Sequence, residues 1–257
     1  MIRSTTQIQQ AYYAETADKY DEMHNQDHDA HGLGLAYMMA MIEFFGISSV
    51  LDVGSGTGFT LLKLKEKMPY IRAVGVEPAP AQRAIGYRKG LLETELVDGD
   101  AMRLAFPDDS FDLVCEFGVL HHIPRPELAI AEMLRVAKKA IFISDSNNFG
   151  QGERFSRFLK QAINAVGLWP VANLIKTKGR GYTVSTGDGV SYSYSVFTNY
   201  KQISKRCTPV YLLNTGNSAP NLYRTSSHIA LLGIVRPNSR TANEVPAAET
   251  IAASCCR

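Results

Sequence analysis

The most informative candidate ligand-binding residues of this chain are three glycines spaced two residues apart, Gly54, Gly56 and Gly58. They follow an apolar, β-type run that contains Asp52, and a helix-type run begins just after them. Glycine lets a backbone turn tightly and lets a ligand approach without a Cβ in the way. A strand, a glycine loop and a helix in this order open a nucleotide-type α/β unit. A dinucleotide fingerprint would need glycine at position 59, which is Phe59, so the spacing argues against a dinucleotide.

An acidic residue follows the next apolar run at a useful distance. Glu77 ends the run 73–76 and lies 19 residues beyond Gly58. A carboxylate about 20 residues past a glycine loop suits bidentate hydrogen bonding to ribose hydroxyls. A lone glutamate would be interpreted as a solvated acid at a strand end. The glycine loop before it favours the ribose role.

Two adjacent histidines, His121 and His122, follow the apolar run 111–115. Histidine titrates near neutral pH, so either residue could take a proton from a hydroxyl or ammonium group as a general base. One of them could instead hydrogen-bond to backbone. The sequence does not favour one histidine over the other.

A second group of histidines, His24, His28 and His31, has the spacing H-x3-H-x2-H and lies near Asp27 and Asp29. On a helix this spacing could bind a divalent metal. The stretch is so polar that a solvated loop is the preferred interpretation, with contact to a ligand at a pocket mouth as an alternative. We therefore predict no metal site.

The glycine pattern resembles motif I of the class I S-adenosylmethionine (SAM)-dependent methyltransferases, and further stretches fit the same family. The loop from Val119 to Pro124 is similar to the V-L-H-H loop of a small-molecule branch that includes ubiquinone/menaquinone-type and sugar N-methylating enzymes. The resemblance covers about residues 10–146. It implies SAM as the cofactor and S-adenosylhomocysteine (SAH) as the product.

The resemblance also assigns cofactor contacts to single residues. Asp100 would face the adenine amino group, Ala101 would offer its backbone N–H to a ring nitrogen, and Pro78 would pack on the adenine. Glu116 and Phe117 would line the methionine end. The predicted cofactor residues are Tyr13, Tyr20, Asp52, Gly54, Ser55, Gly56, Gly58, Glu77, Pro78, Asp100, Ala101, Glu116 and Phe117.

Tyr13 and Tyr20 are seven residues apart, which is two turns along one helical face. In relatives, tyrosines of this N-terminal stretch close over the bound cofactor. The same spacing also describes ordinary core packing. Ala14 stands where the family usually has an acid, so the two roles stay open.

The elements that must position these residues alternate between strand and helix. Strands are predicted near 49–53, 72–76, 94–97, 111–115 and 139–144, after a helical stretch over 4–24 and a helix over 35–45. Such alternation predicts a parallel sheet with helices on both faces. Two strand-like runs, 209–214 and 227–235, have no helical pattern between them and predict a terminal antiparallel hairpin. The fold class is therefore α/β: a Rossmann-like, seven-stranded methyltransferase sheet.

We predict a single domain over residues 1–236. Its parts are an N-terminal cap (1–46), a cofactor-binding core (47–146), an insert (147–208) and the terminal hairpin (209–236), followed by a disordered tail (237–257). The apolar fraction of 45% and charged fraction of 20% are ordinary for a soluble globular protein. The start of the chain has no apolar core of a signal peptide, and the four cysteines have no framework spacing. A cytoplasmic location is the expectation.

The insert 147–208 is where substrate choice is expected to lie. It contains nine Lys and Arg residues against two acids, a net charge of +7 in a chain of net charge +2. Apolar residues from Phe155 to Val166 recur at helical spacing, with basic residues between them. Three hypotheses remain open. The insert could be a helix packed on the domain with a solvated basic face, or a lid whose aromatic side chains exclude water, or a basic amphipathic face on an anionic membrane.

The lid hypothesis assigns substrate contacts. Lys178 or Arg180 would hold an anionic group of the substrate, and Tyr192 and Tyr194 would line its pocket. No RNA-binding signature accompanies the basic residues, and the motif of base-amine methylases is absent after the fourth strand. We therefore expect a small-molecule partner and no nucleic acid, with weak membrane contact through the insert and the oligomeric state left open.

The predicted function is SAM-dependent methyl transfer to a small anionic or glycosylated metabolite. O-methylation is favoured because candidate bases are present. The alternatives are N- or C-methylation of a lipid-linked or isoprenoid intermediate at a membrane surface, and a non-catalytic SAM-binding protein.

Overall fold

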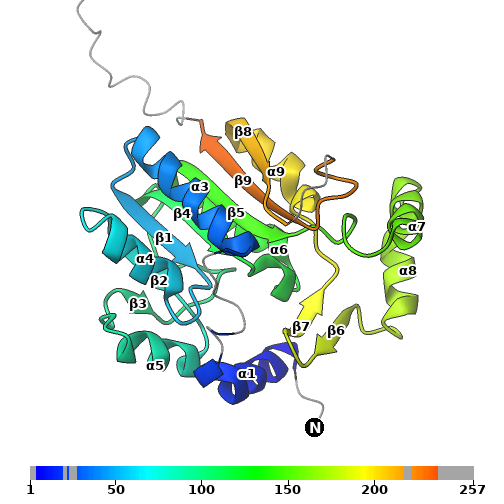
Figure 1. Ribbon diagram of the computed structural model, residues 1–257, viewed down its shortest axis with the longest axis horizontal. Helices are drawn as coiled ribbons and strands as arrows, with labels where there is room; N and C mark the ends of the chain where they lie inside the picture. Colours follow the sequence, from blue (N-terminus) through cyan, green and yellow to red (C-terminus); the bar gives the residue numbers. More distant parts are fainter. Residues whose placement is uncertain (1–3, 20–21, 23–27, 217–220, 237–257) are drawn as a thin grey trace, which may run out of the picture.

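The computed structural model describes residues 4–19, 22, 28–216 and 221–236. Its centre is a seven-stranded sheet with the order β3-β2-β1-β4-β5-β9-β8 (Figure 1). The strands are β1 (Ser49–Val53), β2 (Arg72–Val76), β3 (Leu96–Val97), β4 (Phe111–Phe117), β5 (Ala137–Ser146), β8 (Cys207–Asn214) and β9 (His228–Val235). β3, β2, β1, β4 and β5 run parallel, and β9 and β8 complete the sheet as an antiparallel pair. The predicted α/β sheet with a C-terminal hairpin is confirmed.

Helices cover both faces of this sheet. They are α3 (Ala30–Phe44), α4 (Phe59–Lys67), α5 (Pro80–Arg88), α6 (Pro126–Val136) and α9 (Tyr200–Arg206). Alternate residues of one strand serve the two faces. Leu51 packs in one cluster with Met133 of α6, whereas Val50 packs in another with Met38 and Ile42 of α3. Fully burying each such side chain contributes roughly 1.5–3 kcal/mol, so the two clusters fix the sheet edge from which the functional loops extend.

The N-terminal helix α1 (Thr5–Thr16) continues as the short 3₁₀-helix η1 (Ala17–Lys19). A capping box of Ser4 and Gln7 begins α1. No α1 residue is buried, and the helix lies beside β7 (Gly189–Tyr192) of the insert rather than on the sheet (Figure 1). Gln9 joins them, because its Oε1 accepts from the Val190 N–H at 2.6 Å. The predicted N-terminal helical cap thus meets the insert.

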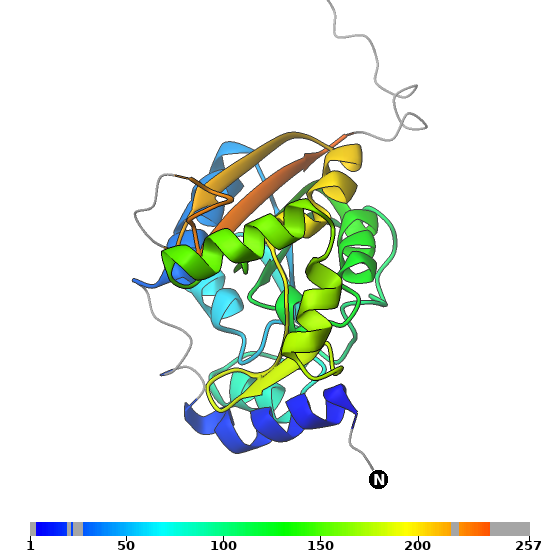
Figure 2. The ribbon, with the colours of Figure 1, turned by 90° about the vertical axis from the view of Figure 1, so that its right-hand side faces the viewer.

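The insert forms α7 (Arg154–Ala165), α8 (Trp169–Lys176), a hairpin of β6 (Tyr182–Ser185) with β7, the 3₁₀-helix η3 (Val196–Asn199), and α9. α7 and α8 lie at the surface, on the side that faces the viewer in Figure 2. Asn147 anchors the start of the insert, since its buried amide donates to the carbonyls of Tyr223 (2.8 Å) and Ser226 (2.9 Å). Its Oδ1 accepts from Ser195 Oγ at 2.8 Å.

The orientation of α7 differs from the first hypothesis for the insert. That hypothesis places the apolar side of the helix against the domain and the basic side in water. In the structure Phe155 and Phe158 are exposed, whereas Gln161 donates to backbone carbonyls of the body. The spacing of apolar residues predicts that a helix is amphipathic. It does not predict which side faces the body, because that depends on contacts with residues remote in sequence.

No helix among the described residues is long and apolar enough to cross a membrane. The predicted disordered tail from residue 237 lies outside the described residues, as do Tyr20 and His24.

Candidate active site

The glycine loop follows β1 and turns under the start of α4. Gly54, Gly56 and Gly58 have φ values of 71°, 54° and 77°, in the left-handed region that favours glycine. The N–H groups of Gly54 and Ser55 both donate to the Val76 carbonyl, at 2.8 and 3.0 Å. A Cβ on Gly54 would lie 2.5 Å from a Val119 methyl group. The loop is therefore held against β2 and against the loop after β4.

Glu77 is buried beside this loop at the end of β2. Its carboxylate accepts from the Gly56 N–H at 3.0 Å and from the Ala79 N–H at 2.8 Å. Burial raises the pKa of Glu77 to about 7, although these hydrogen bonds and Arg83 oppose the rise. A carboxylate has about four lone-pair sites, so oxygen lone pairs remain for ligand hydroxyls.

A cavity of about 250 Å³, here the glycine-loop cavity, lies between α1 and the carboxyl ends of the strands. Eight of the predicted cofactor residues line it: Tyr13, Gly54, Gly56, Glu77, Pro78, Asp100, Ala101 and Phe117. Thr5, Thr6 and Gln9 of α1 contribute to the same wall. The structure therefore gathers residues from 5 to 124 around one space.

Two buried carboxyl groups hold the walls of this region. Asp52 accepts from Ser55 Oγ at 2.6 Å, and burial raises the pKa of Asp52 to about 6. Glu116 accepts from the N–H groups of Val119 (2.8 Å) and Ser144 (3.1 Å). Burial, reinforced by Asp145, raises the pKa of Glu116 well above its usual value. Glu116 fixes the loop after β4 but does not line any of the cavities described here, so its contact with a cofactor stays a prediction.

The histidine pair lies on the 3₁₀-helix η2 (Leu120–His122), directly after β4. His121 Nδ1 lies 2.7 Å from Oδ1 of Asp145, a fully buried residue of β5. The backbone N–H of His121 donates to the other oxygen of Asp145 at 3.2 Å. Burial alone would lower the pKa of His121, but Asp145 and Asp188 raise it well above its usual value. In turn, His121 outweighs burial and lowers the pKa of Asp145 to about 2.

His122 has a different anchor. Its Nδ1 lies 2.6 Å from the Val190 carbonyl oxygen, which can only accept, so Nδ1 carries the proton. The Nε2 atoms of both histidines then face the carboxylate of Asp188, each at 3.4 Å. Asp188 precedes β7, and burial would raise its pKa, but the two histidines hold it well below the usual range.

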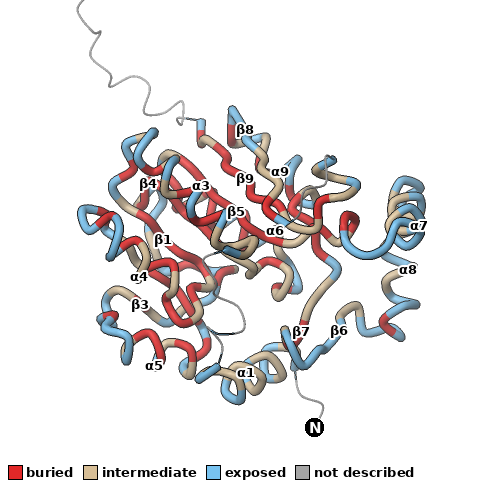
Figure 3. Tube along the Cα trace, viewed as in Figure 1, coloured by how far each residue is buried: buried red, intermediate tan, exposed pale blue. Residues whose placement is uncertain are grey.

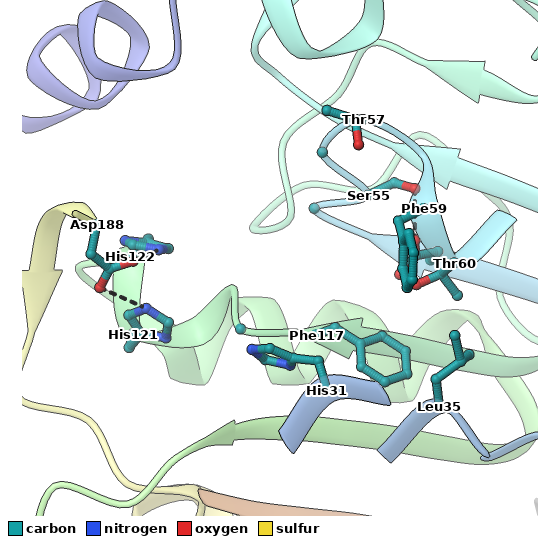
Figure 4. A pocket seen from close by; sticks show the side chains of 14 residues that line it. His31, Leu35, Ser55, Thr57, Phe59, Thr60, Phe117, His121, His122 and Asp188 are labelled. Carbon is teal, nitrogen blue, oxygen red and sulfur yellow. Dashed lines mark hydrogen bonds and ion pairs between the residues drawn. The ribbon is translucent and has the colours of Figure 1, made fainter. Parts of the chain in front are cut away.

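A central cavity of about 90 Å³ contains this cluster (Figure 4). It shares Gly54, Gly56, Phe117, Gly118 and His122 with the glycine-loop cavity. His121 and Asp188 also line a third cavity of about 210 Å³ under the insert, here the insert cavity. The histidine pair therefore lies at the junction between the glycine loop and the insert.

The insert cavity is rich in hydroxyl and amide groups. Its lining is His121, Ser146, Asn148, Gln151, Asn173, Lys176, Thr177, Gly181, Tyr182, Thr183, Asp188, Ser191, Tyr192, Ser193 and Tyr194. Tyr194 is buried, and its Oη has no hydrogen-bond partner among the described residues. Such groups are suited to bind a polar ligand with several hydroxyls.

The predicted substrate residues separate into two pairs. Tyr192 and Tyr194 line the insert cavity. Lys178 and Arg180 are exposed and do not line it; the basic residue in the lining is Lys176. Lys178 and Arg180 follow the end of α8, where the chain turns away through Gly179 and Gly181 at positive φ.

Sequence reasoning missed Asp145, Asp188 and Gln9. Asp145 had a usable signal, because it directly follows the fifth predicted strand (139–144), at the same sheet edge as the histidines. Asp188 is one of only two acids in the insert, between two glycines. Gln9 gave no signal, since only the fold brings α1 to the 188–190 turn.

The ligand atoms of His121, His122 and Asp188 all lie within 4.8 Å of one another, a spacing that a divalent cation could also share. Hydrogen bonding of the two histidine rings to the Asp188 carboxylate accounts for the same geometry. The histidines that the sequence suggested for metal binding are not part of this cluster; His31 lies instead beside Phe117 in the central cavity (Figure 4).

Comparison with protein-family models matches residues 51–143, just over a third of the chain, to a methyltransferase domain. The demethylmenaquinone methyltransferase of Thermus thermophilus is 38% identical over 90 residues, which cover 34% of this chain and 41% of that protein. The chloroplastic 2-methyl-6-phytyl-1,4-hydroquinone methyltransferase of Arabidopsis thaliana is 37% identical over 90 residues, 35% of this chain and 27% of that protein. The match thus spans less than half the length of these curated relatives.

Solved structures share the fold over a longer stretch. A SAM-dependent methyltransferase of Thermotoga maritima superposes with a TM-score of 0.58 at 16% identity, covering 88% of this chain and 99% of that one. Magnesium protoporphyrin IX methyltransferase of Synechocystis, solved with bound SAH, gives a TM-score of 0.56 at 14% identity, covering 91% and 100%. At these identities the likeness concerns the fold alone. The family match and the sequence relatives identify residues 51–143 as a class I SAM-dependent methyltransferase domain, related to the menaquinone and phytylhydroquinone methyltransferases.

Proposed function

We propose that this protein transfers the methyl group of SAM to a hydroxyl group of a small, polar, glycosyl-like acceptor. The observation that carries the proposal is the position of His121: it lies between the glycine-loop side of the site and the hydroxyl-rich insert cavity. A methyl acceptor bound in the insert cavity would therefore lie beside the histidine pair, on the side opposite to the glycine loop.

The residues of the glycine-loop cavity fit SAM. Gly54 leaves room where a Cβ would collide, and Glu77 keeps lone pairs for ribose hydroxyls. Asp100 and Ala101 lie in the same wall, as an adenine contact requires. SAM supplies an electrophilic methyl group that needs no metal activation. The tasks left to this chain are to align the acceptor and to accept its proton.

His121 is the proposed proton acceptor. Asp145 holds its Nδ1, which leaves Nε2, the atom that faces Asp188, to take a proton. Because Asp145 and Asp188 stabilise the imidazolium, His121 must first lose a proton before it can act as a base at Nε2. The same carboxylates then stabilise the imidazolium that forms when the acceptor hydroxyl is deprotonated. His122, tied to the Val190 carbonyl, is assigned to orienting Asp188 and the acceptor.

The acceptor class follows from the insert cavity. Hydroxyl and amide side chains dominate its lining, and Lys176 adds one positive charge. Tyr182 and Tyr192, with ring centroids 5.9 Å apart, offer aromatic surface to a sugar ring. These groups favour an O-methylated, glycosyl-like acceptor with an anionic substituent near Lys176.

Methylation of a lipid-linked acceptor is a second candidate. Relatives that match by sequence include methyltransferases named for demethylmenaquinone and for 2-methyl-6-phytyl-1,4-hydroquinone. In this chain the insert cavity is bounded by α8, whose other side carries exposed apolar residues such as Val171 and Ile175. In a lipid-linked sugar, the glycosyl group would occupy the insert cavity and the lipid would contact the exposed apolar side of α8.

The test is transfer of labelled methyl from SAM to a panel of free sugars, sugar phosphates and lipid-linked sugars. We expect label in one of these classes with the native chain, and strongly reduced label with the His121→Ala variant. Binding of SAM without transfer to any class would instead favour the non-catalytic SAM-binding alternative. Equal transfer by His121→Ala would remove the assigned base.

A further inference from the structure

Helix α7 is amphipathic, but it turns its polar side toward the protein. Gln161 donates to the carbonyl oxygens of Phe149 (2.9 Å) and Arg224 (2.8 Å). Lys160 donates to the Gln151 carbonyl at 2.9 Å. No residue of α7 is buried. The helix is thus held to the body by hydrogen bonds, and its apolar side is left without protein cover.

The uncovered side carries large apolar residues at helical spacing. In the described part of the chain, sixteen large apolar side chains are exposed, and eight of them lie between residues 155 and 175. These eight define the α7–α8 patch: Phe155, Phe158, Leu159, Val166, Leu168, Val171, Leu174 and Ile175. Phe155 is 77% exposed and Ile175 is 74% exposed. Figure 3 shows α7 and α8 as mostly exposed elements at the edge of the molecule.

A concentration of this kind needs an apolar partner. Single exposed apolar side chains are normal, whereas a contiguous group marks a surface that contacts protein or membrane. The amphipathic sequence of α7 does not by itself require its apolar side chains to be exposed, because the opposite rotation of the helix would bury them against the body. The hydrogen bonds of Lys160, Gln161 and Asn164 instead fix the outward orientation.

Charge around the patch indicates the partner. Arg154 begins α7, Lys176 ends α8, and Lys178 and Arg180 follow; all four are exposed. Glu153 is the single acid in the stretch from 147 to 187. Apolar side chains flanked by basic residues match the interface of an anionic bilayer, where the apolar groups enter the acyl boundary and the basic groups meet lipid phosphates.

We propose that the α7–α8 patch docks this protein on the surface of an anionic lipid bilayer. The docked helix lies next to the insert cavity, because Asn173, Lys176 and Thr177 of the α8 region line that cavity while Val171 and Ile175 are exposed. An acceptor whose polar group projects from the bilayer would thus reach the cavity without leaving the membrane. The docking itself does not depend on the proposed methyl transfer.

Vesicle co-sedimentation tests the docking with the full chain. The probes are vesicles of phosphatidylcholine alone and vesicles that also contain phosphatidylglycerol. We expect the native protein to sediment with the anionic vesicles, and more weakly with the neutral ones. The variant Phe155→Ser/Phe158→Ser/Ile175→Ser should bind the anionic vesicles at least about tenfold more weakly, since it removes apolar groups that enter the acyl boundary.

The matched control is Phe44→Ser on α3, because Phe44 is 78% exposed but lies outside the patch. It should sediment like the native chain. Circular dichroism and SAM binding check that the triple variant is folded. Absence of native binding to anionic vesicles would overturn the proposal, and so would equal binding by the triple variant. A native dimer in light scattering that the triple variant lacks, without vesicle binding, would assign the patch to a second copy instead and would also overturn it.

Discussion

His121 Nδ1 lies 2.7 Å from Oδ1 of Asp145, at the point where the ends of β4 and β5 meet. Asp145 belongs to β5, and His121 lies on η2, which follows β4. These two strands are parallel neighbours, so their carboxyl ends lie on one edge of the sheet. Asp145 also accepts the backbone N–H of His121 at 3.2 Å. One carboxylate therefore fixes both the ring and the backbone of the proposed base.

Replacing Asp145 by Asn should lower turnover and shift its pH dependence. If neutral His121 is the active form, turnover rises with pH until the imidazolium is fully deprotonated. Asp145 raises the pKa of His121, so Asp145→Asn should move this rise to lower pH. We expect turnover at the plateau to fall by about 10²-fold, within the range typical of acid–base assistance. A pH–rate profile measures both effects.

The matched control is Asp108→Asn, since Asp108 is an exposed acid paired with Arg135 and lines neither the glycine-loop cavity, the central cavity nor the insert cavity. It should leave the profile unchanged. A profile for Asp145→Asn that coincides with that of the native enzyme would contradict the assigned relationship.

The affinity for SAM should depend on the ionisation of Glu77. Burial raises the pKa of this carboxyl to about 7, and only the ionised form accepts two ribose hydroxyls. Affinity should therefore increase from pH 6 to pH 8, by roughly tenfold if the neutral form does not bind. Glu77→Gln should bind SAM more weakly and without this pH dependence. Calorimetric titration at three pH values would measure it, and a native affinity that falls as pH rises would contradict the assignment.

Gly54→Ala should disrupt the glycine loop. The residue has a φ of 71°, and its new Cβ would lie 2.5 Å from Val119. The left-handed backbone alone costs about 1–2 kcal/mol for a residue with a Cβ, so we expect a lower melting temperature and much weaker SAM binding. Gly187→Ala is the matched control, because a Cβ there meets no atom within 4 Å. Native-like SAM binding by Gly54→Ala would show that the loop tolerates displacement.

Chelation distinguishes the proposed base from a metal at the same cluster. His121, His122 and Asp188 are close enough to share a cation. If His121 accepts a proton and His122 orients Asp188 and the acceptor, methyl transfer should be unchanged after treatment with EDTA and dialysis. Loss of transfer that Mg²⁺, Mn²⁺ or Zn²⁺ restores would contradict the metal-free account.

Much of the sheet edge could be predicted from sequence, because its signals are local. The glycines, Glu77, Asp100 and the histidines each lie within five residues after a strand, and parallel strands bring their carboxyl ends together. The β8–β9 hairpin was equally accessible, since no helical pattern separates its strands.

The substrate side could not be predicted in the same way. Asp188 reaches the histidines only because the β6–β7 hairpin folds back over η2, and Gln9 reaches Val190 only because α1 lies beside β7. The outward orientation of α7 depends on carbonyl acceptors at Phe149 and Arg224, which its own sequence does not contain. These contacts join residues far apart in the chain, and periodicity within one segment carries no information about them.

Calorimetric titration of the native protein with SAM and with SAH, beside the variants Glu77→Ala and Glu66→Ala, tests the central claim most directly. Glu66 is an exposed glutamate on α4 and serves as the control. We predict saturable binding of both ligands by the native chain and by Glu66→Ala, and strongly weakened binding by Glu77→Ala. No binding of either ligand by the native chain, or unchanged affinity in Glu77→Ala, would contradict it.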